Sequence, residues 1–169
     1  MKKLYPLIYS ILILLVVVSI SKCFSMYFFI QITDSMPKGL YYKKNLDKIM
    51  IGDIAVFSPP DNAKQIIYER GWLLKNLECN LMKPVVAIEN DVVKISITDG
   101  LLINNKYFGP VKSYDSKGLP LTVFQGQRKI QKEEFFFASS YCPNSFDSRH
   151  FGPIKKNALI GIAEPFVIF

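Results

Sequence analysis

An uninterrupted apolar segment lies close to the N-terminus. Residues 4–21 carry no charge and are dense in Leu, Ile and Val, with Lys3 before them and Lys22 after them. As an α-helix this segment would rise about 27 Å, and flanking lysines can reach past a bilayer core about 30 Å thick. A cleaved signal peptide is the alternative, but the run exceeds a usual signal-peptide core and no alanine precedes Ala55 to form a cleavage site. The pattern favours an uncleaved transmembrane anchor over residues 1–24.

Beyond the anchor, short runs of alternating apolar and polar residues are typical of β-strands. Asp99-Gly100 predicts a hairpin, and Asn104-Asn105 predicts a second turn. Asp61 is expected to cap one short helix that ends near Arg70. Strands are expected at residues 39–42, 52–57, 81–88, 92–97, 101–103, 121–124 and 134–138, and as a pair within residues 158–169.

These strands predict one mainly β, antiparallel domain over residues 25–169. Its first residues, 25–32, are apolar and aromatic, and they suit either the headgroup region of a bilayer or a first strand. About 140 residues are enough to bury a single core without help from a metal.

The formal net charge of +7 comes almost entirely from lysines that are spread along the chain, with only three arginines. Because a nucleic-acid site usually gathers its basic residues, we expect no nucleic-acid partner. The spread charge fits a solvated surface and is also compatible with contact with anionic membrane lipid.

The cysteines Cys23, Cys79 and Cys142 lack the paired spacing of a zinc site, so no metal and no cofactor are expected. Cys23 falls at the end of the apolar segment. In an oxidising compartment Cys79 and Cys142 could form a disulfide that closes a loop of about 60 residues and stabilises the fold by about 4 kcal/mol.

Candidate chemistry begins with Ser35, shortly after the apolar segment and just before Pro37 and Gly39, which constrain the backbone. This placement predicts a nucleophile held near a bilayer surface. A serine hydroxyl needs a general base to react at neutral pH, and the chain offers one histidine and many lysines.

Lys83 is our candidate base because it has the most apolar sequence surroundings of the lysines. A lysine accepts a proton only when burial lowers its pKa, since the ammonium form has no lone pair. An edge-strand lysine that points to water is the alternative explanation. His150 offers a competing Ser-His-Asp triad with Asp147, although a lone histidine beside Arg149 also fits a solvated surface.

Acyl transfer also needs donors for the developing oxyanion. The backbone N–H of Ser35 is one candidate, and the hydroxyl of Thr33, two residues earlier on the same face of an extended segment, is the second. A hydroxyl that only stabilises the turn would explain Thr33 equally well.

Four segments, in matching order from Thr33 to the C-terminus, resemble the signal-peptidase family and are most similar to its conjugal-transfer branch, the TraF-type peptidases. Each motif is weak alone, but four in order are specific. They are residues 33–41, the turn and strand from Gly52-Asp53, residues 83–87 with residues 91–93, and residues 145–154.

The resemblance implies a membrane-anchored, antiparallel β-barrel-like (LexA-like) catalytic domain in the bacterial inner membrane, with a single span and an active site that faces the periplasm. The positive-inside rule agrees slightly, because Lys2 and Lys3 precede the span and a long domain can cross regardless of its charge.

The resemblance also implies a Ser-Lys dyad, with Ser35 as nucleophile, Lys83 as base and the hydroxyl of Ser148 helping to orient the lysine. It also implies that Asp147 and Arg149 support the site. Thr33 fits the role of an oxyanion donor.

The chain departs from the family pattern at two places. Asn90 stands where a glycine usually precedes Asp91, and asparagine tolerates the left-handed conformation, so the turn is expected to survive. His150 replaces a residue that is usually aromatic. Pro37 lies only two residues after Ser35 and a single span is visible, which favours the conjugation branch over general leader peptidases.

The sequence therefore predicts a membrane-anchored serine endopeptidase that processes the pilin precursor of a conjugative type IV secretion system, by cleavage or by cyclisation. One alternative is a general type I signal peptidase that acts on many exported proteins. An alternative of another class is a non-catalytic anchored domain that scaffolds secretion machinery.

Overall fold

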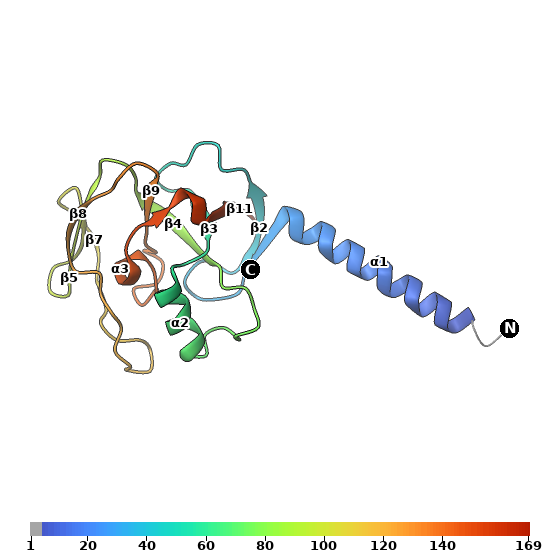
Figure 1. Cartoon of the computed structure of the whole chain (residues 1–169). Helices are drawn as coiled ribbons and strands as arrows, with labels where there is room; N and C mark the ends of the chain where they lie inside the picture. Colours follow the sequence, from blue (N-terminus) through green and yellow to red (C-terminus); the bar gives the residue numbers. More distant parts are fainter. Residues whose placement is uncertain (1–4) are drawn as a thin grey trace.

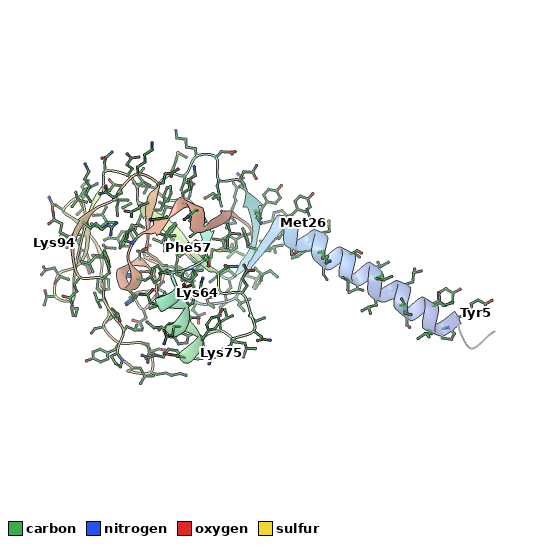
Figure 2. All side chains as sticks on the ribbon, in the orientation of Figure 1. Tyr5, Met26, Phe57, Lys64, Lys75 and Lys94 are labelled. Carbon is green, nitrogen blue, oxygen red and sulfur yellow. The ribbon has the colours of Figure 1, made fainter. Side chains whose placement is uncertain are left out.

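The computed structural model describes residues 5–169, in which a long helix leads directly into a β-domain (Figure 1). The helix, α1 (Tyr5–Tyr27), has no buried residue. Its side chains between Tyr5 and Met26 project freely, whereas Phe57 lies inside the domain (Figure 2). Within residues 5–169, α1 is the one helix long and apolar enough to cross a membrane. It fits a single-pass anchor.

Every strand pairing between named strands of residues 5–169 is antiparallel, which confirms the predicted fold class. The larger sheet has the order β1-β2-β11-β3-β4-β9-β10, and the smaller sheet has the order β7-β6-β5-β8. The larger sheet comprises β1 (Phe28–Gln31), β2 (Gly39–Lys44), β3 (Ile54–Phe57), β4 (Leu81–Ala87), β9 (Glu134–Phe137), β10 (Ile154–Lys155) and β11 (Leu159–Ile168). The smaller sheet comprises β5 (Val92–Ser96), β6 (Gly100–Ile103), β7 (Lys106–Gly109) and β8 (Gly126–Lys129).

Three short helical segments complete the domain: α2 (Asp61–Glu69), α3 (Ser148–Phe151) and the 3₁₀-helix η1 (Lys156–Ala158). α2 matches the predicted helix, but Asp61 is its first residue and Pro60 occupies the cap without a side-chain hydrogen bond. The sequence analysis did not anticipate α3, a single turn that becomes important at the site.

The core forms where alternate residues of the strands turn inward. Phe57 of β3 stacks on Phe137 of β9 with ring centroids 4.3 Å apart, and both side chains are fully buried. A second cluster joins the two sheets, with Val93 and Leu101 of the smaller sheet packed near Phe136 of β9. Burial of such apolar surface is the main stabilising term of the fold.

An aromatic cluster joins α1 to the domain without a linker. Phe24 near the end of α1 stacks on Phe28 at 5.0 Å, and Phe28 contacts Tyr42 of β2 and Phe166 of β11. Such aromatic pairs add stabilisation beyond their buried area. The cluster therefore connects α1 with three strands of the larger sheet.

Two strand predictions were wrong. Residues 121–124 form no strand, because their backbone bonds to loops and helix ends instead: Leu121 N–H donates to Ser113 O, and Phe124 N–H donates to Arg149 O. The expected closing pair is one long strand, β11, whose irregularity falls between Pro165 and Val167. Proline is tolerated at such a bulge.

The turn predictions agree with the structure. Asn104 and Asn105 have positive φ angles of 49° and 64° between β6 and β7, and Gly100 has a φ of 82° where β6 begins. Asn90, in the turn before β5, has a φ of 75°. Asparagine enters this left-handed region more readily than most residues, so the turn survives without glycine.

Candidate active site

Ser35 lies in the turn between β1 and β2, and other segments hold that turn in place. The Tyr41 hydroxyl donates to the carbonyl of Pro37 at 2.7 Å, and the Ser139 hydroxyl donates to the carbonyl of Ser35 at 2.7 Å. Tyr41 and Ser139 are both buried. The backbone carbonyls of Ser35 and of Pro37, two residues later, are therefore held by side chains from the segment after β9 and from β2.

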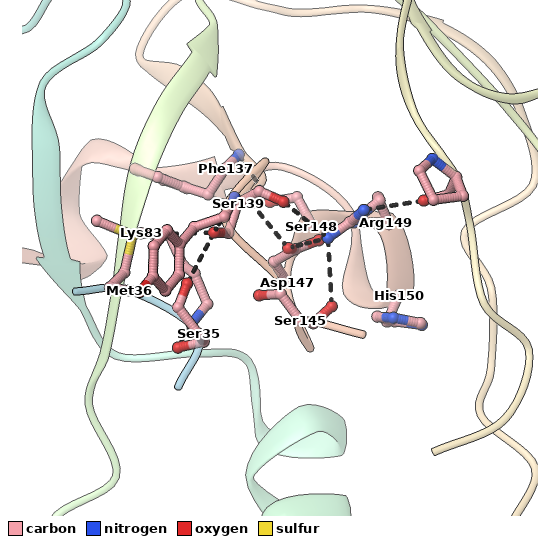
Figure 3. Close-up of polar contacts among 12 residues, drawn as sticks. Ser35, Met36, Lys83, Phe137, Ser139, Ser145, Asp147, Ser148, Arg149 and His150 are labelled. Carbon is pink, nitrogen blue, oxygen red and sulfur yellow. Dashed lines mark hydrogen bonds and ion pairs between the residues drawn. The ribbon is translucent and has the colours of Figure 1, made fainter. Parts of the chain in front are cut away.

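Lys83 comes from the middle of β4, where its backbone pairs with Ala55 of β3. Its side chain is only 3% exposed, and its Nζ lies 2.5 Å from the Oγ of Ser35, within hydrogen-bond distance (Figure 3). β4 is an interior strand of the larger sheet, which excludes the edge-strand explanation of this lysine.

Burial lowers the pKa of Lys83 to about 8, and the positive charge of Arg149 acts in the same direction. The negative charge of Asp147 opposes this shift. With this pKa about a tenth of the amine is neutral at pH 7, compared with well under a thousandth for an ordinary lysine. A neutral amine can accept the proton of Ser35.

Thr33 lies beside the serine, with its Oγ1 3.2 Å from the Oγ of Ser35. Its hydroxyl is thus close to the position expected of an oxyanion donor. The amide of Gln31, a residue that the sequence analysis did not select, donates to the same Thr33 oxygen at 2.7 Å.

Asp147 and Arg149 form a fully buried ion pair behind the dyad (Figure 3). Asp147 caps the N-terminus of α3 and accepts hydrogen bonds from Nε and Nη2 of Arg149 at 2.8 and 2.7 Å. Arg149 also donates to the carbonyls of Pro110, Ser139 and Ser145. The pair therefore ties α3 to two loops, the one after β7 and the one between β9 and α3, and both charges of the pair have partners, as buried charges require.

Ser139 connects this ion pair with the nucleophile. Its N–H donates to Asp147 Oδ2 at 3.2 Å, its carbonyl accepts from Arg149, and its hydroxyl donates to the carbonyl of Ser35. The sequence contained no signal for this role, because the contact with Ser35 joins residues that are 104 positions apart in the chain.

Ser148 does not reach the lysine as expected. Its hydroxyl accepts a hydrogen bond from the N–H of Phe137 at 3.0 Å, and the hydrogen bonds of residues 5–169 include none between Ser148 and Lys83. Ser148 instead fastens α3 to β9. The hydroxyl of Ser145, three residues earlier, is buried without a hydrogen-bond partner in the described chain.

His150 is not arranged as a triad base. Its Nδ1 lies 3.0 Å from the carbonyl oxygen of Thr122, and its ring stacks on Phe146. Burial lowers the pKa of His150 below its ordinary value, so the ring is neutral near neutral pH. Figure 3 places His150 across Asp147 from Ser35, where it packs α3 against a neighbouring loop.

Among the cysteines, Cys79 is buried and Cys142 is partly buried, and both are free thiols in the structure, so the predicted disulfide is not formed in it. Within the described residues no group of three or more His, Cys, Asp or Glu side chains could hold a metal ion.

A model of the family described as "Signal peptidase, peptidase S26" matches residues 2–168. The chain belongs to this signal peptidase family. As a member of it, the chain is a serine peptidase that acts on a protein substrate.

Relatives of this peptidase carry names from conjugation. The chain is 30% identical over 151 residues to "Conjugal transfer protein TraF" of Agrobacterium fabrum, covering 83% of this chain and 82% of the relative. It is 30% identical to a "Plasmid transfer protein TraF" of Escherichia coli, covering 80% of each chain. A crystal structure of a signal peptidase I from Enterococcus faecalis V583 aligns with a TM-score of 0.41 at 18% identity, covering 70% of this chain and 98% of that chain.

Proposed function

We propose that this peptidase uses Ser35 as nucleophile and Lys83 as general base to process the pilin precursor of a conjugative type IV secretion system. The observation that carries the proposal is the 2.5 Å separation of Lys83 Nζ and Ser35 Oγ, with the lysine buried and its pKa lowered to about 8. The conjugal-transfer and plasmid-transfer names of the relatives support a role in conjugation. The apolar helix α1 supports membrane anchoring. The lysines Lys2 and Lys3 before the span favour a β-domain on the periplasmic side.

The chemical steps follow from the positions of these groups. The O–H bond of Ser35 breaks as Lys83 gains the proton, and the serine oxygen bonds to the scissile carbonyl carbon. The carbonyl electron pair moves to its oxygen, which Thr33 Oγ1 and the N–H of Ser35 would stabilise. Collapse of this intermediate expels the amine, which takes the proton from Lys83 and leaves an acyl-enzyme. Water then releases a cut chain, whereas the amino terminus of the precursor would release a ring.

Separate Ser35→Ala and Lys83→Ala variants test the dyad. We expect each to abolish processing while the protein stays folded and inserted, which thermal unfolding and membrane fractionation would check. Retained processing in both variants would support a non-catalytic scaffold, and full activity in Lys83→Ala with loss in His150→Ala would support the triad.

Co-expression with the pilin precursor, followed by intact-mass measurement, tests the substrate. A product that differs from the precursor by the removed segment alone is a cut chain, and one lighter by a further water is a ring.

The alternative is a general signal peptidase, which the family description supports. That alternative predicts processing of unrelated exported proteins as efficiently as the pilin precursor.

A further inference from the structure

Gln31 is a buried amide beside the nucleophile with no role in the mechanism above. It is the last residue of β1, only 7% exposed, and its backbone pairs with Gly39 of β2. Buried polar side chains are normally hydrogen-bonded, and the partners of this one decide what it can do.

Both hydrogen bonds of the Gln31 side chain go to Thr33. Its Nε2 lies 2.9 Å from the carbonyl oxygen of Thr33 and 2.7 Å from Thr33 Oγ1. A backbone carbonyl can only accept, so the atom that faces it is the amide nitrogen. Because that nitrogen only donates, Thr33 Oγ1 must accept from Gln31.

This fixes the direction of the next hydrogen bond. The Thr33 hydroxyl has one proton and lies 3.2 Å from Ser35 Oγ. Since the bond with Gln31 uses an oxygen lone pair, the Thr33 proton is free to be donated to Ser35 before the attack, and to the oxyanion once the serine oxygen has bonded to carbon. Ser35 then accepts from Thr33, and its own proton is left for Lys83 Nζ, 2.5 Å away.

We propose that Gln31 is a positioning residue that sets the direction of a donor chain from Gln31 through Thr33 to Ser35, so that the serine proton points at Lys83. The proposal rests on the Ser-Lys mechanism above. Without Gln31, Ser35 could donate to Thr33 instead, and its proton would face away from the base. The amide touches no reacting atom and acts only through Thr33.

Gln31→Glu is the sharpest test, because it keeps the shape of the side chain and replaces a donor with an acceptor. A carboxylate would accept the Thr33 proton and reverse the chain. We expect kcat at the high-pH plateau to fall about 100-fold with little change in KM, since general-base catalysis contributes about 10²–10⁴-fold. The assay uses the full chain in detergent and a quenched-fluorescent peptide with small residues before the cut.

The pH profile separates this effect from simple electrostatics. A new negative charge near Lys83 raises the pKa of the lysine and moves the rising limb of the profile to higher pH. Full recovery of kcat at the plateau would mean that only the charge matters, and would overturn the proposal. A lowered plateau supports it.

Thr33→Val supplies the matched background. If Gln31 acts through Thr33, Gln31→Glu lowers the plateau kcat in the wild type but changes it less than about threefold in Thr33→Val, a strong coupling in a double-mutant cycle. An equal loss in both backgrounds would contradict the proposal. Should Gln31→Glu fail to fold, Gln31→Met removes the donor without a charge, and the same cycle applies, with a smaller loss of about tenfold expected in the wild-type background.

The dyad variants distinguish an error in the Ser-Lys mechanism from an error in the role proposed for Gln31. Activity that survives both Ser35→Ala and Lys83→Ala overturns the mechanism itself. Activity that is lost in both of them but intact in Gln31→Glu overturns only the role of Gln31.

Discussion

At the residue scale, the ionisation of Lys83 should control the pH dependence of the enzyme. With its pKa lowered to about 8, kcat/KM should rise with pH and level off above an apparent pKa of about 8. A profile measured with the fluorescent peptide checks this, with Lys94→Ala, an exposed lysine of β5, as a control that should leave the curve unmoved. A rising limb near the ordinary pKa of histidine would contradict the assignment.

The same shift has a consequence for stability. Between about pH 8 and pH 10.5 the unfolded chain binds more protons at this lysine than the folded chain does. Burial of the charged amine therefore lowers the free energy of unfolding below about pH 8, and this cost disappears as the pH rises to 10.5.

Asp147 is the second residue for which a single change should have a large effect. Asp147→Ala leaves the guanidinium of Arg149 buried without its carboxylate, and breaking a buried pair in this way costs about 3–5 kcal/mol of unfolding free energy. Chemical denaturation measures the loss. Glu164→Ala, which removes a half-exposed partner of Lys44, is the control and should change little. Equal effects of the two changes would contradict the structural role of the buried pair.

At the element scale, β11 packs so closely against the start of β2 that adding one methyl group at Gly39 should disturb the pairing. A Cβ on Gly39 would lie 2.3 Å from the carbonyl oxygen of Val167. Gly39→Ala should therefore push β11 away, lower stability by about 1–3 kcal/mol and reduce kcat, because Gly39 follows the turn that carries Ser35.

Gly109→Ala is the matched control for this change. Gly109 also lies in a strand, but a Cβ there would meet nothing within 4 Å. Thermal unfolding and peptide cleavage should show nearly wild-type behaviour for Gly109→Ala. Similar losses in the two variants would mean that the close approach of β11 has no special effect.

The elements also explain what the sequence could and could not predict. The β4 and β5 strands and the turns at Asn90 and Asn104 were predictable because apolar alternation and turn chemistry act locally. β8 was missed because its residues are polar and mostly exposed, so no alternation marks it. α3 was missed because its single turn depends on the Asp147 cap and on contacts from distant loops.

The residues of the site also fall into those that the sequence could predict and those that it could not. A serine before Pro37 and a lysine within an apolar strand could be recognised from neighbouring residues. Ser139 and Gln31 could not, because their importance lies in which hydroxyl or carbonyl each one meets across the fold. Ser148 was assigned to the lysine by resemblance, but its hydroxyl accepts a hydrogen bond from the N–H of Phe137 instead.

At the scale of the whole molecule, the orientation in the membrane is the property to test. We expect the N-terminus in the cytoplasm and the β-domain outside it, because Lys2 and Lys3 precede α1. Alkaline phosphatase fused after Phe169 should be active, since it matures only outside the cytoplasm, and a cytoplasmic reporter at the same place should be inactive. The reverse pattern would contradict the proposed orientation.

Because α1 leads directly into β1, the distance between the end of α1 and the nucleophile Ser35 is limited. Ser35 is only eight residues beyond Tyr27, the last residue of the helix, so even a fully stretched chain could lift its oxygen no more than about 27 Å above that point. If α1 spans the bilayer, this chain length limits the distance between the membrane surface and the active site. A precursor held by its own membrane segment would then be cut only at bonds within that distance of the membrane surface.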